Sequence, residues 1–185
     1  MRRFEFVADR PVLNFVATVA ERGSTDDEKL RTGADLAAWV RQSGIVDGPL
    51  TVTPDQLDHA KAVREALFGL ISALIDGSVP APRERSLVNA AARLPGPTLA
   101  LTAAGTVQRR GDLAAVLAAL ARDCLALHDS PDARALRWCA DARCTRPFVD
   151  RSRGRRRRWC GMKGCGDRAK AASYRQRRRT ADHPQ

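Results

Sequence analysis

With 185 residues and an apolar content of 44%, the chain is long enough for one hydrophobic core and a small second module. It has no apolar run long enough to span a bilayer, and its start lacks the features of a signal peptide, so we expect a cytoplasmic protein. The net charge of +11 is uneven: residues 1–136 hold 16 Lys and Arg against 17 Asp and Glu, whereas residues 137–185 hold 16 against 4. A polyanion partner or a disordered solubilising tail accounts for such a segment.

The first part of the chain predicts a mainly helical domain. Two helices, over 33–43 and 54–76, each begin with a threonine in capping-box spacing and end before a glycine. The caps are Thr32 with Asp35 and Thr53 with Gln56, and the glycines are Gly44 and Gly77. A shorter helix lies within 82–96, a β-hairpin pairs 99–102 with 106–109, and a final apolar helix lies within 112–128.

Residues 1–136 contain no pattern that predicts catalysis, so we expect no enzyme. His59 is two positions from Leu57, near the opposite helix face, and is expected to be solvated. His128 falls in a last helical turn, where the helix dipole favours a cation. Cys124 falls on the apolar face of its helix, which predicts a buried structural thiol.

Four further cysteines, Cys139, Cys144, Cys160 and Cys165, have the spacing C-x4-C-x15-C-x4-C. Arg-Trp precedes the first cysteine of each pair, so the two halves repeat one another. Because we expect a reducing compartment, one closed tetrahedral zinc site is favoured over two disulfides. An iron–sulfur cluster is the alternative metal site. Bound zinc favours an ordered basic segment with a polyanion partner over a disordered tail.

Zinc is also expected to help fold this segment, because residues 137–179 have few large apolar side chains. We predict a hairpin that pairs Phe148 and Val149 with Arg158 and Trp159 about the turn Arg-Ser-Arg-Gly. Trp138 and Trp159, each next to a ligand, are expected to pack over the metal.

From Gly166 onward, good helix formers and the absence of proline predict a basic helix of about a dozen residues, roughly 18 Å long. Guanidinium groups bind two phosphate oxygens or the edge of guanine with paired hydrogen bonds. Arg168 is either a DNA contact or a brace for the metal loops. The predicted nucleic-acid-binding residues are Arg153, Arg155, Arg156, Arg157, Arg158, Arg168, Lys170, Arg175, Arg177, Arg178 and Arg179.

Residues 138–179 resemble the CGNR zinc finger, whose Cys-Gly-Asn-Arg signature stands here as Cys-Gly-Asp-Arg from Cys165 to Arg168. The preceding part resembles the ABATE domain: its opening motif, of the type Leu-Asp-Phe-Val-Asn-Thr, corresponds to LNFVAT from Leu13 to Thr18, and ADLAAWVRQSGI matches a second element. The resemblance implies a bacterial transcription regulator whose finger binds double-stranded DNA and whose amino-terminal domain is regulatory.

Together these features predict a mainly α fold: a helical domain with a small β-hairpin, then a treble-clef-like four-cysteine zinc finger made of a hairpin and a helix. The predicted boundaries are 1–133 for the ABATE-like domain, 134–179 for the finger and 180–185 for a disordered tail. Three positions depart from the family patterns. Asp167 replaces the signature asparagine, Asn14 replaces the aspartate of the opening motif, and Ala17 replaces its asparagine.

Two functional alternatives remain open from the sequence. Arginine clusters also suit an RNA-binding or ribosome-associated zinc module, although RNA readers often carry stacking aromatic residues. Thiolates beside arginines are oxidisable, so a thiol–zinc redox sensor is a further hypothesis. The oligomeric state is a separate question: because one finger has a small footprint, one hypothesis is a homodimer on an inverted repeat, joined through the Ala/Leu-rich helices.

Overall fold

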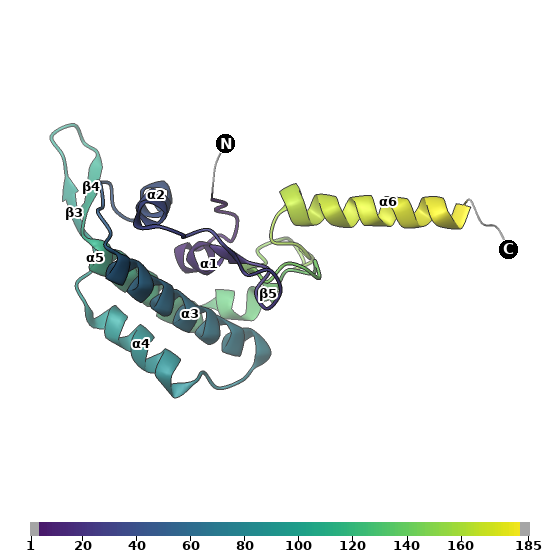
Figure 1. Ribbon diagram of the computed structural model, residues 1–185, viewed down its shortest axis with the longest axis horizontal. Helices are drawn as coiled ribbons and strands as arrows, with labels where there is room; N and C mark the ends of the chain where they lie inside the picture. Colours follow the sequence, from purple (N-terminus) through teal and green to yellow (C-terminus); the bar gives the residue numbers. More distant parts are fainter. Residues whose placement is uncertain (1–3, 182–185) are drawn as a thin grey trace.

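Helices account for most of the structure, a computed structural model that describes residues 4–181 (Figure 1). No helix in this part of the chain is long and apolar enough to cross a membrane. The α-helices are α1 (Pro11–Val16), α2 (Gly33–Ser43), α3 (Pro54–Asp76), α4 (Pro82–Arg93), α5 (Leu113–His128) and α6 (Asp167–Ala181). Of two short turns, η1 (Pro131–Ala135) precedes the finger and η2 (Met162–Gly166) lies within it, directly before α6.

The strands form three separate antiparallel pairs. They are β1 (Val19–Ala20) with β2 (Asp27–Glu28), β3 (Thr98–Leu101) with β4 (Val107–Arg110), and β5 (Leu136–Trp138) with β6 (Pro147–Val149). The β3–β4 hairpin is the one predicted from the sequence, shifted by one residue, and it projects from the body next to α5 (Figure 1).

The predicted helix caps are confirmed. In α2 the Thr32 hydroxyl accepts from the backbone N–H of Asp35 while the Asp35 carboxylate accepts from that of Thr32, and Thr53 and Gln56 form the same reciprocal pair in α3. The helices end at Gly44 and Gly77, whose φ of +68° lies in the left-handed region that glycine adopts without steric cost. Local sequence therefore determines where both helices begin and end.

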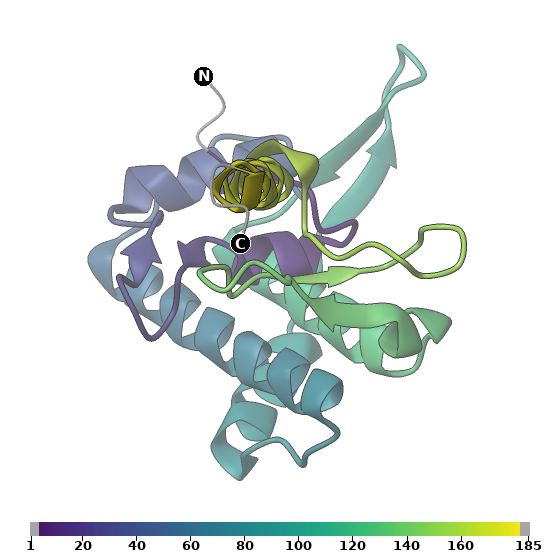
Figure 2. The same ribbon diagram turned by 90° about the vertical axis from the view of Figure 1, so that its right-hand side faces the viewer.

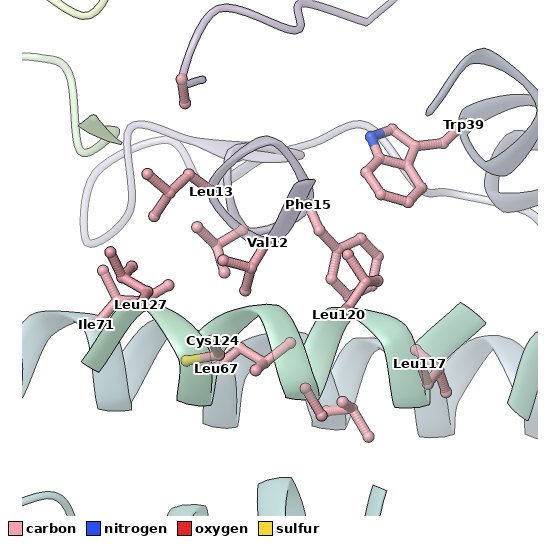
Figure 3. Close-up of a cluster of buried hydrophobic side chains, with 14 of the residues drawn as sticks. Val12, Leu13, Phe15, Trp39, Leu67, Ile71, Leu117, Leu120, Cys124 and Leu127 are labelled. Carbon is pink, nitrogen blue, oxygen red and sulfur yellow. The ribbon is translucent and has the colours of Figure 1, made fainter. Parts of the chain in front are cut away.

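The core lies where α1 packs across α3 and α5 (Figure 3). The short helix α1, which the sequence analysis did not predict, contributes Val12, Leu13 and Phe15, all completely buried. Trp39 of α2 covers one end of this layer, with its ring centroid 4.9 Å from that of Phe15. Cys124 is buried in α5 as predicted, and burial raises the pKa of its thiol to about 12, so it remains protonated.

The hairpin of the finger differs from the prediction. Phe148 pairs with Arg137 and Val149 with Leu136. The predicted partners, Arg158 and Trp159, lie outside this hairpin. The prediction placed the turn of the hairpin at Arg-Ser-Arg-Gly. In the structure the first cysteine loop is the connection between the two strands, β5 and β6. Arg158 lies instead beside that loop, where its carbonyl oxygen accepts a hydrogen bond from the backbone N–H of Ala140 at 2.8 Å.

The β5–β6 hairpin belongs to the same core as the helical domain. Leu136, Phe148 and Val149 are 2% exposed or less and join the buried cluster formed by α1, α3 and α5. Helix α6 by contrast leaves the body beyond η2 and points away from it (Figure 1). It continues to Ala181, past the predicted start of a disordered tail, and residues 182–185 lie outside the described part.

Candidate metal centre and basic surface

Four cysteines from distant parts of the finger place their sulfurs together. The Sγ atoms of Cys139, Cys144, Cys160 and Cys165 all lie within 4.8 Å of one another. The Cys144–Cys160 and Cys160–Cys165 sulfur distances are both 3.7 Å. Tetrahedral zinc with Zn–S bonds of about 2.3 Å requires sulfurs about 3.8 Å apart. The sulfur set therefore fits one four-coordinate Zn²⁺.

Each cysteine pair is held by its own loop. Cys139 and Cys144 stand in the loop that joins β5 to β6. Cys160 precedes η2 and Cys165 lies within it, and Gly164 of η2 has a φ of +89° that turns the chain back towards the metal. Helix α6 starts two residues after Cys165, so the last ligand and the first turn of the helix are fixed together.

Hydrogen bonds surround the sulfurs. The backbone N–H of Cys160 lies 3.4 Å from the sulfur of Cys139, and Nη2 of Arg168 lies 3.1 Å from the sulfur of Cys165. The other arm of Arg168 donates from Nε to Oδ2 of Asp141 at 2.8 Å. Arg168 thus joins both cysteine loops, which is the bracing role considered from the sequence, achieved through a carboxylate and a sulfur. Such outer contacts orient ligands and tune their affinity for the metal.

The thiols influence one another's protonation. Hydrogen bonds from Cys144 and Cys160 hold the pKa of Cys139 far below its ordinary value, whereas burial raises the pKa of Cys165 to about 12. The pKa values of Cys144 and Cys160 are also raised, first by their hydrogen bonds with Cys139. Since zinc binds thiolates, metal binding to this set displaces protons and strengthens as the pH rises.

Two protein-family models match the chain in this order. The model ABATE, described as "Putative stress-induced transcription regulator", matches residues 9–131, which is more than half of the chain. The chain belongs to the ABATE family. The CGNR zinc finger model matches residues 135–178, so this ABATE protein carries a CGNR zinc finger whose four cysteines form a site for one zinc ion. A comparison with curated proteins finds no match.

The finger is docked on the ABATE domain through Trp138. Its indole Nε1 donates to Oδ1 of Asp76 at 3.2 Å, and its ring lies 5.7 Å from that of Phe68. Trp138 therefore packs on α3, in contrast to its predicted place over the metal, because the chain folds β5 against the helical domain. Trp159 is half-buried and packs against the shared core.

Two arginines of the loop 151–158 extend this docking. Nε of Arg157 donates to the carbonyl of Trp159 at 2.9 Å, and its Nη2 donates to that of Val7 at 3.0 Å. Arg151 forms an ion pair of 2.6 Å with Asp132, which also receives Arg10 at 3.1 Å. These guanidinium groups therefore stabilise the fold of the loop. The clustering of arginines in the sequence did not predict this structural role.

Most of the predicted nucleic-acid contacts are exposed. Seven of them are exposed and form no ion pair with a carboxylate in the described part of the chain: Arg153, Arg155, Arg156, Arg158, Lys170, Arg175 and Arg178. Arg177 is also exposed, Arg157 and Arg168 are engaged as described above, and the side chain of Arg179 lies outside the described part.

A basic groove runs between α6 and the first cysteine loop. Its volume is about 440 Å³, and its lining includes Arg143, Arg158, Trp159, Arg168, Ala172 and Arg175. Arg143 was not among the predicted contacts, although its position directly before Cys144 places it on the metal-held loop. Figure 2, which looks along α6, shows the arginine-rich loop to one side of this helix.

Proposed function

We propose that this ABATE protein is a zinc-dependent, DNA-binding transcription regulator. The observation that carries the proposal is the course of α6, which stands away from the body and presents exposed cations (Figure 1). Lys170, Arg175 and Arg178 have no ion-pair partner among the described residues, so their charge is available to phosphate. Because the family is described as a transcription regulator, DNA is the polyanion that we propose as the partner of these cations.

The dimensions of α6 suit double-stranded DNA. Its 15 residues make a rod of about 22 Å, and the major groove of about 12 Å width admits an α-helix. With α6 in the groove, the basic groove beside it, lined by Arg143 and Arg158, would face the phosphate backbone. Most contacts in such an interface position the protein, and a few arginines read base edges.

Zinc links this surface to the rest of the molecule. Apart from Arg168, α6 has few contacts with the body, and it is joined to η2. The metal would fix Cys165, and through it the direction in which α6 leaves the body. DNA binding through α6 would therefore require the zinc ion, even though the zinc ion itself would not contact the DNA.

The ABATE domain would then act as the regulatory part. Its apolar helices α3 and α5 bury most of their large side chains in the core, although Leu125 of α5 is exposed, so a homodimer through these helices would use little apolar surface. The exposed apolar residues of the β3–β4 hairpin, Leu99, Leu101 and Val107, are a different surface that a homodimer would use.

RNA binding is the second candidate function, favoured by two aromatic residues. Tyr174 on α6 is 56% exposed, and half-buried Trp159 lines the basic groove. Stacking on unpaired bases uses such side chains. We prefer duplex DNA because three of the exposed cations, Lys170, Arg175 and Arg178, lie along one helix.

The experiment uses the full zinc-loaded chain and fluorescence anisotropy with a random DNA duplex and a matched single-stranded RNA. We expect tighter binding to DNA, with a log–log salt slope of about −5 to −7 for six to eight neutralised phosphates. Arg175→Ala with Arg178→Ala should reduce that slope by about 1 for each lost contact. The control, Arg83→Ala with Arg85→Ala on α4, removes the same charge from exposed sites at the other end of the molecule and should have little effect. Tighter binding to the RNA would favour the second function.

A further inference from the structure

A small pocket lies where the ABATE domain meets the finger, away from the basic groove. Its volume is about 150 Å³, and Asn14, Ala17, Lys29 and Trp39 line it on the ABATE side. Glu5 and Arg146 also line it, and Arg146 stands two residues after the zinc ligand Cys144. The pocket thus connects the helical core with the metal loop.

The indole nitrogen of Trp39 has an unmet hydrogen-bonding requirement. Trp39 is completely buried, and its Nε1 has no hydrogen-bond partner among the described residues. Figure 3 shows this nitrogen on the edge of the ring turned away from α5. A buried donor without a partner is energetically costly, so such a group calls for an acceptor that the described residues do not supply.

The other polar groups of the pocket are also mainly donors. Oδ1 of Asn14 already accepts from the backbone N–H of Ala8 at 3.1 Å, which leaves its NH2 group to donate. The Thr18 hydroxyl is already used, because it donates to the carbonyl of Phe15 and accepts from Arg64. A ligand that fits this lining must bring acceptors.

Charge and size narrow the ligand further. Lys29 and Arg146 supply two positive charges to the lining; Arg146 is paired with Glu5, and Lys29 is paired with Asp27, so a ligand carboxylate would compete with these two acidic partners. The pocket is smaller than the about 300–1,000 Å³ of sites for drug-sized molecules, and Phe4, Ala17 and the Trp39 ring add apolar surface. These properties suit an anion of a few heavy atoms with a short apolar part.

We propose that this pocket binds a small organic carboxylate, whose oxygen accepts the Trp39 N–H while its charge faces Lys29 and Arg146. Asn14 and Ala17, two departures from the opening motif of the family, both line the pocket.

Binding at this place would act on the finger through one ion pair. Arg146 of the metal loop is paired with Glu5 of the amino-terminal segment, and the carboxylate of a ligand competes with Glu5 for the same guanidinium. Occupancy would thereby change how the amino-terminal segment holds the loop that carries Cys144. This second step rests on the proposed DNA-binding function, whereas binding itself does not.

The test measures thermal stability of the full zinc-loaded chain with acetate, propionate or pyruvate, each compared with chloride at equal ionic strength. We expect at least one carboxylate to raise the melting temperature saturably above the chloride control. Trp39→Phe retains an aromatic ring and removes the N–H. It should lower the affinity for that carboxylate about tenfold, which corresponds to the loss of one charge-assisted hydrogen bond of about 1.4 kcal/mol. In chloride, Trp39→Phe also loses part of a completely buried ring, so its own melting temperature in chloride is the reference for its carboxylate shifts.

A second variant protects the test against a folding defect in the first. The Lys29 side chain is partly exposed, so Lys29→Gln should retain the fold. It should weaken binding of the same carboxylate. Absence of any carboxylate-specific shift would overturn the proposal, as would an unchanged affinity in both variants. Failure of DNA binding would leave all these shifts in place, so the two proposals fail separately.

Discussion

Arg168 in the first turn of α6 forms an ion pair of 2.7 Å with Asp141 in the first cysteine loop. The same guanidinium lies 3.1 Å from the sulfur of Cys165. The pair therefore connects the two halves of the metal site across 27 residues of sequence. It gives Arg168 a role that is separate from nucleic-acid binding.

Replacement of Arg168 by alanine should weaken zinc binding by about 10–100-fold, the range found when outer contacts of metal ligands are removed. Competition with a chromogenic chelator measures this affinity. Arg178→Ala removes the same charge from an exposed position on the same helix and should leave zinc affinity unchanged. Equal zinc affinity in both variants would show that Arg168 does not support the metal.

Arg157→Ala should destabilise the protein by roughly 2 kcal/mol, because the carbonyls of Val7, Trp159 and Cys160 lose a charged donor. The guanidinium also lies 4.7 Å from the centroid of the Phe148 ring. Urea denaturation at pH 7 measures the change. The adjacent Arg156→Ala is the matched control, since that side chain is exposed, and a similar loss in both variants would contradict the anchoring role.

The pH dependence of stability should report on Asp132. Hydrogen bonds from Arg151 and Arg10 lower the pKa of this carboxyl from its ordinary value of 3.8. A lowered folded-state pKa means that the stabilisation is complete above about pH 4 and is lost as the pH falls through the folded value.

Asp132→Asn should therefore melt at a lower temperature than the parent at pH 7, and the difference should narrow below about pH 4. Asp129→Asn changes an exposed carboxylate nearby and provides the control. A difference in melting temperature that stays constant from pH 7 to pH 3 would rule out the ion pairs as its source.

The isolated finger should fold poorly. Leu136, Phe148 and Val149 are buried in the core shared with the ABATE domain, and Trp138 packs on α3. A fragment of residues 134–185 exposes these side chains, so even with zinc it should lack cooperative melting. A well-dispersed NMR spectrum of this fragment with zinc would show that the finger folds independently.

Zinc removal should release one metal ion per chain and reduce the helical circular dichroism contributed by α6.

A redox-sensing finger should lose zinc in the same way when it is treated with peroxide. Half-buried Cys144 is the thiol that peroxide would reach first, since the other three ligands are buried. Mass spectrometry of trapped thiols identifies the site. Cys124→Ala serves as the control that retains all four ligands, and zinc release without oxidation at these ligands would exclude the redox role.

Local chemistry made several elements predictable. The capping boxes at Thr32 and Thr53 and the glycines that end their helices act within one or two turns, so the sequence contains all the partners involved. The spacing of the four cysteines, together with a preference of zinc for thiolates, likewise determined the metal site. The family resemblance, borne by the motifs themselves, was confirmed by the family models.

Long-range contacts decided the rest. The pairing of Phe148 with Arg137, the docking of Trp138 on Phe68 and the inward course of Arg157 depend on groups up to 150 positions apart. A charge pattern does not distinguish an arginine that binds backbone carbonyls from one that meets solvent. The helix ends, the zinc ligands and the basic character of the finger were predictable because they depend on neighbouring residues and spacing. Which arginines form no ion pair, where the finger packs and that the Trp39 N–H has no acceptor among the described residues all depend on burial, which brings distant residues together.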